Sequence, residues 1–269
     1  MQYDPIKKRL GNFFNQTPFL RRLFYCLLDL LLLRTWHVKK ELRTLRRENM
    51  NILDAGSGFG QYSYRMCRMF PDARIKGVDV KQEQIDDCNS FFTSIKLNDR
   101  VGFEYADLTK FTEPNKYDLI LSVDVMEHIL EDELVFRNFH NSLRDNGILL
   151  VSTPSDQGGS DADEHEGDSV HGFIGEHVRD GYGIEEIKEK LGRAGFSSVE
   201  ARYVYGKPGS LSWRLSMKYP ILMLGKSKLF FVILPFYYLI LFPFCAVLNY
   251  LDVNTNHKTG TGLLVKASK

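Results

Sequence analysis

The sequence predicts an α/β fold with a doubly wound, mostly parallel sheet, and two observations support this prediction. From Met50 to Thr153, apolar runs of strand length alternate with segments of helical periodicity, and such alternation gives a parallel sheet with helices on both faces. A glycine-rich turn follows the first apolar run, at the kind of position where open α/β sheets bind ligands. The first five strands are expected near Ile52, Val78, Phe103, Ile120 and Leu149.

The segment before the first strand, residues 1–47, is expected to be helical. Thr17 is a favourable N-cap, and Pro18 suits the first helical position because its missing N–H is not needed there. No proline or glycine interrupts the chain from Phe19 to Arg47, so one continuous N-terminal helix is expected. Its apolar stripe, within Phe19–Leu33, would cover the core of the fold. In the alternative, it would lie at a membrane interface with the basic end of the helix on anionic headgroups.

The glycine-rich turn has the spacing Gly-x-Gly-x-Gly and is preceded by an acid, Asp54. A dinucleotide fingerprint would require a third glycine at position 61, which is Gln61, so an NAD-dependent oxidoreductase is disfavoured. Asp54 is placed to meet a cationic amino group, which favours a ligand that carries an amino acid. A second acid, Asp79, ends the next apolar run, where the second strand of such a fold presents a carboxylate to ribose hydroxyls.

Four segments in this region resemble, in order, the motifs of class I S-adenosylmethionine-dependent methyltransferases. They are Asp54–Gly60, Asp79, Ala106-Asp107-Leu108 and Tyr117–His128. The fourth has the Glu-His form of the type 11 branch, which includes ubiquinone-pathway O-methyltransferases. The resemblance covers residues 48–206 and the last ten residues. It implies a Rossmann-like seven-stranded sheet with an antiparallel last strand, and S-adenosyl-L-methionine as the cofactor. The cofactor-binding residues that it implies are Asp54, Gly56, Ser57, Gly58, Gly60, Asp79, Val80, Asp107, Leu108, Ser122 and Val123.

Methyl transfer to a phenol or enol needs a general base, and histidine suits that role at neutral pH. The candidates are His128, beside Glu127 in the fourth motif, and His171 and His177 in a long segment after the fifth strand. That segment is expected to form a lid or binding loop over the same sheet edge. It also holds His165 among Glu164, Glu166 and Asp168, but a flexible acidic loop is a commoner outcome than a metal site, so no metal is assigned. An amphipathic helix and a sixth strand follow it.

Residues 207–258 depart from a minimal methyltransferase. Leu229–Leu251 carries no charge and is long enough, as a helix, to span a bilayer core. A single crossing, however, would separate the strand-like segment Thr261–Ala267 from its sheet. The sequence therefore predicts a hydrophobic helical insert that is monotopic, either a proline-kinked hairpin or an in-plane helix in one leaflet. Its basic neighbours Arg214, Lys218, Lys226 and Lys228 would lie near headgroups. A buried lid, a homodimer interface and a true span remain open alternatives.

Composition limits the partners. Lys and Arg total 35 against 34 Asp and Glu, so no general affinity for nucleic acid is expected. The four cysteines are scattered without metal-ligand spacing, which favours a reducing compartment. The expected division is an N-terminal helical segment (1–47), a methyltransferase domain (48–206 and 259–269) and a membrane-associating insert (207–258). The expected function is methyl transfer to a lipophilic, membrane-borne acceptor at the cytoplasmic face of a membrane. The alternative is a catalytically silent, cofactor-binding scaffold of a membrane pathway complex.

Overall fold

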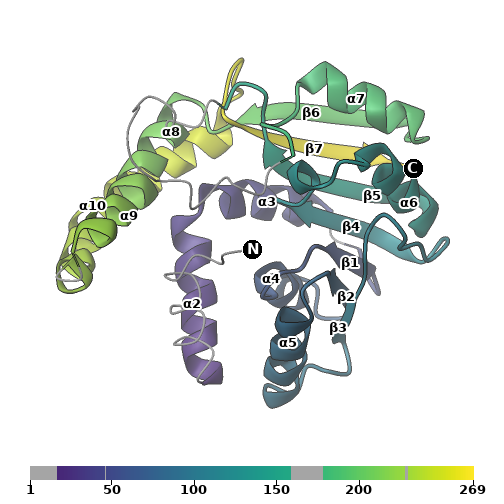
Figure 1. The fold of residues 1–269 in the computed structure, drawn as a ribbon, viewed down its shortest axis with the longest axis horizontal. Helices are drawn as coiled ribbons and strands as arrows, with labels where there is room; N and C mark the ends of the chain where they lie inside the picture. Colours follow the sequence, from purple (N-terminus) through teal and green to yellow (C-terminus); the bar gives the residue numbers. More distant parts are fainter. Residues whose placement is uncertain (1–16, 46, 159–177, 228–229) are drawn as a thin grey trace.

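The protein is built on one seven-stranded sheet (Figure 1). The computed structural model describes residues 17–45, 47–158, 178–227 and 230–269. The strand order is β3-β2-β1-β4-β5-β7-β6, in which β7 runs antiparallel to both of its neighbours and β1 to β5 pair in parallel. The strands are β1 (Asn51–Ala55), β2 (Arg74–Asp79), β3 (Val101–Tyr105), β4 (Tyr117–Val123), β5 (Leu143–Pro154), β6 (Ser198–Val204) and β7 (Gly262–Ser268). The predicted fold class, including the antiparallel last strand, is confirmed.

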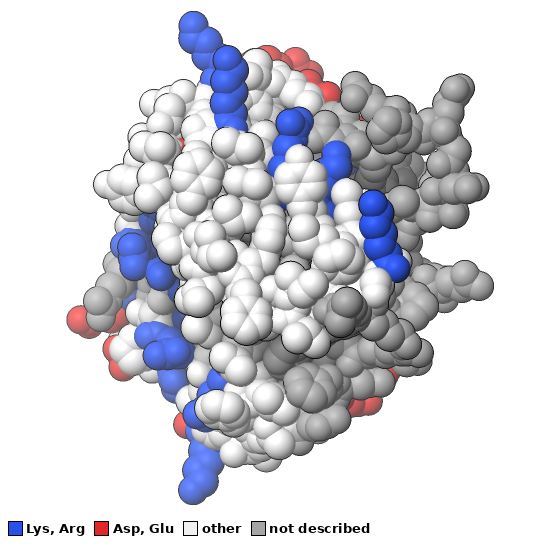
Figure 2. Space-filling view, turned by 90° about the vertical axis from the view of Figure 1, so that its left-hand side faces the viewer, with Lys and Arg blue, Asp and Glu red and all other residues white. Residues whose placement is uncertain are grey.

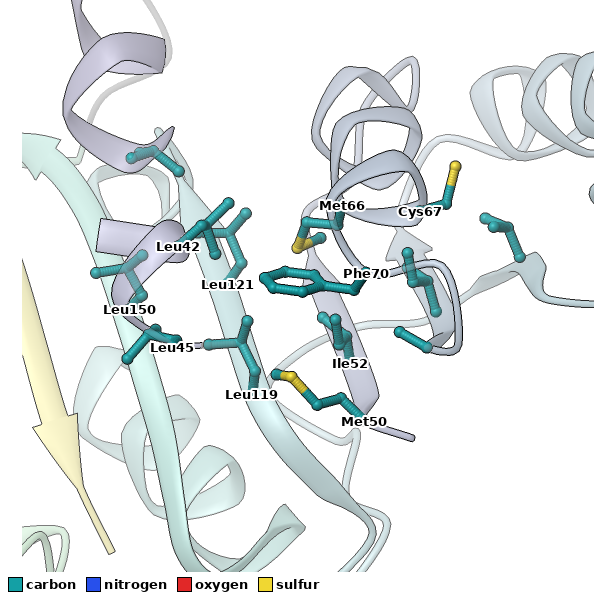
Figure 3. Close-up of a cluster of buried hydrophobic side chains, with 14 of the residues drawn as sticks. Leu42, Leu45, Met50, Ile52, Met66, Cys67, Phe70, Leu119, Leu121 and Leu150 are labelled. Carbon is teal, nitrogen blue, oxygen red and sulfur yellow. The ribbon is translucent and has the colours of Figure 1, made fainter. Parts of the chain in front are cut away.

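Helices cover both faces of the sheet, as a doubly wound fold requires. One face carries α3 (Leu33–Thr44), α4 (Gln61–Met69) and α5 (Gln82–Ser94), and the other carries α6 (Asp132–Ser142) and α7 (Ile184–Arg193). Figure 3 shows the first of these cores, in which Leu42 of α3, Met66 of α4 and Phe70, directly after α4, meet Ile52 and Leu119 of the central strands. All five side chains are buried, so the two central strands are held from this side by helices on either side of β1 in the sequence.

The predicted single N-terminal helix is wrong in one respect, because the structure divides it into α2 (Pro18–Leu31) and α3. Leu32 has an extended backbone conformation (φ −84°, ψ 111°), although no proline or glycine marks the break. The reason is tertiary packing, since α2 and α3 run in different directions (Figure 1) and bury different side chains. Tyr25 of α2 is 1% exposed and Leu42 of α3 is fully buried. Thr17 is the N-cap, accepting a hydrogen bond from the Leu20 N–H, as predicted.

A helical hairpin projects from one end of the sheet (Figure 1). Its first arm consists of α8 (Lys207–Trp213), the π-helical segment η2 (Arg214–Lys218) and α9 (Tyr219–Lys226), and its second arm is α10 (Phe230–Asn254). Of the two predicted forms, the uncharged run therefore forms one helix and does not reverse at its prolines, Pro235 and Pro243. Each proline removes only one backbone hydrogen bond, and α10 packs along the first arm over its length.

Tyrosines join the two arms where the first is irregular. The Tyr237 hydroxyl donates to the Leu215 carbonyl oxygen and the Tyr238 hydroxyl to the Ser216 carbonyl oxygen, each over 2.7 Å. Both carbonyls belong to the π-helical segment η2, where the regular helical hydrogen bonds are disturbed. The hairpin is thus a defined unit, and β7 returns to the sheet directly after it.

Candidate functional site

The carboxyl ends of β1, β2, β3 and β4 bring the predicted cofactor residues to one edge of the sheet. Asp79, at the end of β2, accepts hydrogen bonds from the Gly58 N–H (2.9 Å to Oδ2) and the Lys81 N–H (3.0 Å to Oδ1). Its backbone oxygen accepts from the Ala106 N–H, which places Asp107 beside it at the end of β3. The four sequence motifs therefore meet in space as the resemblance implied.

The three glycines of the turn all have positive φ, but they do so for different reasons. At Gly56 (φ +79°) an added Cβ would lie 2.3 Å from Val125 Cγ2, and at Gly60 (φ +78°) it would lie 3.1 Å from Cys88 Sγ. These two glycines allow the turn to pack against its surroundings. At Gly58 the nearest atom would be Gln84 Oε1 at 3.9 Å, so this side of the turn is open to a ligand.

Asp54 is a buried carboxyl group with an incomplete set of partners. It is 2% exposed and accepts one side-chain hydrogen bond, from Ser63 Oγ at 2.6 Å. Burial, with a smaller contribution from the neighbouring Asp79, raises its pKa to about 6 against the hydrogen bonds from Ser63. A cationic group placed here would favour the charged carboxylate and offset the cost of its burial.

Two buried hydroxyl groups at the same edge lack partners. Within the described residues, Ser57 Oγ and Ser122 Oγ have no hydrogen-bond partner, although Ser57 is 7% exposed and Ser122 is fully buried. Buried polar atoms are nearly always hydrogen-bonded, so these two indicate a ligand with polar groups of its own. Together with the anionic Asp79 and the open side of the turn, they fit S-adenosylmethionine, which carries an amino group and ribose hydroxyls.

The remaining predicted cofactor residues flank this position. Asp107 accepts from the Thr109 hydroxyl (2.7 Å) and N–H (3.0 Å), and these hydrogen bonds lower its pKa. The next residue, Leu108, is buried, whereas Val80 is 56% exposed and offers apolar surface after β2. Val123 is partly buried and ends β4, next to Ser122. A ligand that binds Asp107 would thus use the same carboxylate that already accepts hydrogen bonds from Thr109.

Of the three candidate bases, the structure places one. His128 ends the short helix η1 (Met126–His128), which follows β4, and its side chain is exposed. Its neighbour Glu127 is buried and accepts from the Thr153 hydroxyl at 3.1 Å. His171 and His177 lie outside the described residues, as does the candidate metal cluster around His165. His128 therefore stands at the same sheet edge as the cofactor residues.

The N-terminal helices form part of the site, which the sequence reasoning missed. Arg34 of α3 makes an ion pair with Asp124, directly after β4, and its N–H donates to the Tyr205 hydroxyl at 2.8 Å. Asp124 has a positive φ of 52°, unusual for a residue other than glycine. Its position within the fourth motif was the available signal, but nothing in the sequence pointed to Arg34 as its partner.

α2 closes over the glycine-rich turn from the other side. The buried Arg21 guanidinium donates to the carbonyl oxygens of Phe59 (2.9 Å) and Asp87 (3.0 Å). The Gln61 amide donates to Asp29 of α2 at 2.9 Å. Gln61 is the residue that departs from the dinucleotide fingerprint, and its side chain here binds the N-terminal helix α2 through Asp29.

The base of the hairpin is fixed to the same region through a buried carboxylate. Asp252 of α10 is fully buried and pairs with His37 of α3 (2.8 Å) and His257 (3.1 Å). It also accepts from the N–H groups of Tyr205 (3.1 Å) and Gly209 (2.9 Å). Burial alone would raise its pKa, but the hydrogen bond and charge of His37, with His257 and the Gly209 N–H, leave the pKa lowered. Desolvation lowers the pKa of His37. One carboxylate thus joins α3, the end of β6 and both arms of the hairpin.

Known proteins are similar to this chain in sequence and in fold. A family model described as "Methyltransferase domain" matches residues 46–190, just over half of the chain. The ubiquinone biosynthesis O-methyltransferase of Pelagibacter ubique is 26% identical over 39% of this chain and 42% of its own length. The sterol 24-C-methyltransferase of Debaryomyces hansenii is 24% identical over 62% of this chain and 45% of its own. The chain thus spans less than half the length of these curated relatives.

A solved structure shares the fold. Phosphoethanolamine N-methyltransferase 2 of Haemonchus contortus, in complex with S-adenosyl-L-methionine, superposes with a TM-score of 0.60 at 18% identity. The match covers 85% of this chain and 51% of that protein. Residues 46–190, which the family model matches, hold all four motifs. The chain therefore belongs to the methyltransferase-domain family, whose methyl donor is S-adenosyl-L-methionine.

Proposed function

We propose that the protein transfers the methyl group of S-adenosylmethionine to a lipophilic acceptor held in a membrane, and that the transfer is O-methylation of a phenol or enol head group. The proposal that the acceptor is held in a membrane rests on the exposed apolar face of the hairpin. Among the described residues, one helix, Val232–Asn254, is long and apolar enough to cross a membrane, and only 17% of it is buried. A helix that served as a core element would be largely covered.

The donor half of the proposal rests on the sheet edge. Asp54 would meet the cationic amino group of the cofactor, Asp79 its ribose hydroxyls and Asp107 its adenine amino group, with the hydroxyls of Ser57 and Ser122 as further partners. The bound sulfonium supplies an activated methyl group. Because the transfer is an in-line displacement, the main task of the protein is to align donor and acceptor and to exclude water.

The exposed face of the hairpin has the composition of a surface that enters lipid. Phe236, Leu239, Ile240, Val247 and Tyr250 are all more than half exposed. Figure 2 shows this side of the molecule as a broad surface without charged side chains, with Lys and Arg around it and few acids. Apolar side chains with cations beside them are typical of proteins that dip into one leaflet beside anionic headgroups.

The topology favours insertion into a single leaflet. The hairpin leaves the sheet after β6 and returns to it as β7, so both ends stay on one side. On this basis we propose that residues 207–258 are an insert in a methyltransferase domain of residues 48–206 and 259–269. The scattered cysteines favour a reducing compartment, so we propose the cytoplasmic face of the membrane. The exposed side of α2, with Phe19 (73% exposed) and Leu23 (41%), offers a second lipid contact.

The chemistry at the acceptor requires the loss of one proton. The acceptor oxygen forms a bond to the methyl carbon while the carbon–sulfur bond breaks, S-adenosylhomocysteine leaves, and the acceptor proton passes to a base. His128 is the described candidate for that base. The relatives are named for ubiquinone biosynthesis, sterols and phosphoethanolamine, so acceptors in this family differ widely. Support for a phenol comes from the likeness to the first of these.

The test is release of S-adenosylhomocysteine by the purified protein with a membrane lipid extract. Release is expected with the extract and not with the aqueous metabolite fraction, and Asp79→Ala should abolish it. Release that follows the aqueous fraction would overturn the lipophilic acceptor. Cofactor binding without release on either fraction would favour a silent, cofactor-binding scaffold.

A further inference from the structure

A cavity at the base of the hairpin lies at the same sheet edge as the cofactor residues, toward the opposite end of the sheet. It has a volume of about 350 Å³, within the lower range of small-molecule sites. Its walls come from four places: Gln157 after β5, the end of β6, the first arm of the hairpin from Lys207 to Arg214, and the segment before β7. Because β6 runs parallel to β5, its carboxyl end falls on the edge where β1 to β4 also end.

The lining of the cavity is cationic and polar. It includes Lys207 and Arg214, two helical turns apart on the first arm, and the hydroxyl-bearing residues Thr259 and Thr261. Among the described residues that line it, none is acidic. Two cations beside hydroxyl groups suit a phosphate, which accepts several charge-assisted hydrogen bonds.

The cavity also borders apolar surface and the cofactor edge. Leu211, which lines it, is 44% exposed and belongs to the hairpin arm. On the other side Tyr205 lines the cavity while its hydroxyl accepts from the N–H of Arg34, the residue that pairs with Asp124 after β4. A ligand here would thus have an anionic group in the cavity, an apolar part along the hairpin and the cofactor site within the same edge.

We propose that this cavity binds the phosphate of a phosphate-bearing lipid, and that the acceptor of the proposed methyl transfer belongs to that class of amphiphile. This inference rests on the proposed function and narrows its substrate. The phosphate anchors the headgroup at the base of the hairpin, and the tail follows the apolar face into the leaflet.

Calorimetric binding of two water-soluble probes tests the proposal. Short-chain phosphatidic acid carries both the phosphate and an apolar part, whereas inorganic phosphate carries only the first. Short-chain phosphatidic acid is expected to bind, and Lys207→Gln and Arg214→Gln should each weaken it about tenfold, the value of one charge-assisted hydrogen bond. Lys226→Gln is the matched control, because it removes one charge from the far end of the same arm outside the cavity.

The outcomes separate the possibilities. Equal binding of both probes would mean a free-phosphate site and would overturn the lipid part of the proposal. Equal loss in Lys226→Gln, or no loss in either cavity variant, would overturn the site itself. S-Adenosylmethionine binding of each variant reports on folding. If Lys207→Gln leaves lipid-stimulated S-adenosylhomocysteine release unchanged, the cavity proposal fails while the proposed function stands.

Discussion

Replacing two apolar side chains on the hairpin should detach the protein from membranes without harming its cofactor site. Leu239 and Ile240 are 76% and 74% exposed, at the centre of α10. Full burial of such a side chain contributes about 1.5–3 kcal/mol, so three-quarters of that for each gives ~3 kcal/mol for the pair. Because about 1.4 kcal/mol corresponds to a tenfold change, Leu239→Gln/Ile240→Gln should weaken vesicle binding roughly a hundredfold.

Flotation with vesicles that contain anionic lipid measures this loss. Leu130→Gln is the matched control: Leu130 is 77% exposed but lies beside η1 on the sheet domain. Its replacement should leave flotation unchanged, and all variants should bind S-adenosylmethionine as the wild type does. The reasoning is refuted if the double variant floats like the wild type.

Sedimentation of the same variants tests the alternative in which the apolar face of the hairpin is a homodimer interface. If the face were a homodimer interface, the wild type would sediment as a dimer and the double variant as a monomer, with flotation unaffected. The membrane account predicts the same sedimentation for both in detergent.

Three further predictions follow from the site. Asp79→Ala removes the acceptor of two backbone N–H groups and a proposed ribose partner. A hydrogen bond to a charged group contributes about 1.5–3 kcal/mol, so the Kd for S-adenosylmethionine, measured by calorimetry, should rise at least tenfold. Gly56→Ala should lower the thermal midpoint, since φ is +79° and the Cβ would lie 2.3 Å from another side chain, whereas Gly102→Ala meets nothing within 4 Å and should not. The folded protein lowers the pKa of His37 and of Asp252, so the unfolded chain binds more protons at these two groups. Asp54, whose pKa is raised to about 6, acts in the opposite direction between about pH 6 and 3.8. The free energy of unfolding should therefore fall as pH drops below 3.8, where Asp252 holds its lowered pKa, and a rise in denaturant midpoint below pH 3.8 would contradict this.

Much of the cofactor edge could be predicted because each of its parts is local. Asp54, Asp79 and Ser122 lie at the carboxyl ends of their strands and Asp107 lies just past the end of β3, and parallel strands bring their carboxyl ends to one edge. Spacing along the chain therefore translated into proximity in space. The antiparallel last strand was predictable through the family resemblance rather than through periodicity.

The parts that escaped prediction depend on tertiary contacts. Helical periodicity continues through Leu32, and only the packing of α2 and α3 on different surfaces shows that the chain bends there. Arg21 lies within the segment predicted to carry an apolar stripe, Phe19–Leu33, yet its buried guanidinium donates to the Phe59 carbonyl oxygen. The first arm of the hairpin could not be predicted from its sequence because its residues mix charged and apolar types. Only packing against α10 shows that they form one arm.

The central claim, methyl transfer to a lipophilic acceptor, is tested most directly by following the methyl group itself. The protein is incubated with S-adenosylmethionine labelled in the methyl group and with intact membranes, and the label is then divided between organic and aqueous phases. We predict that label enters the organic phase with the wild type and not with Asp79→Ala. Label that enters only aqueous products, or organic label that persists in Asp79→Ala, would contradict the account.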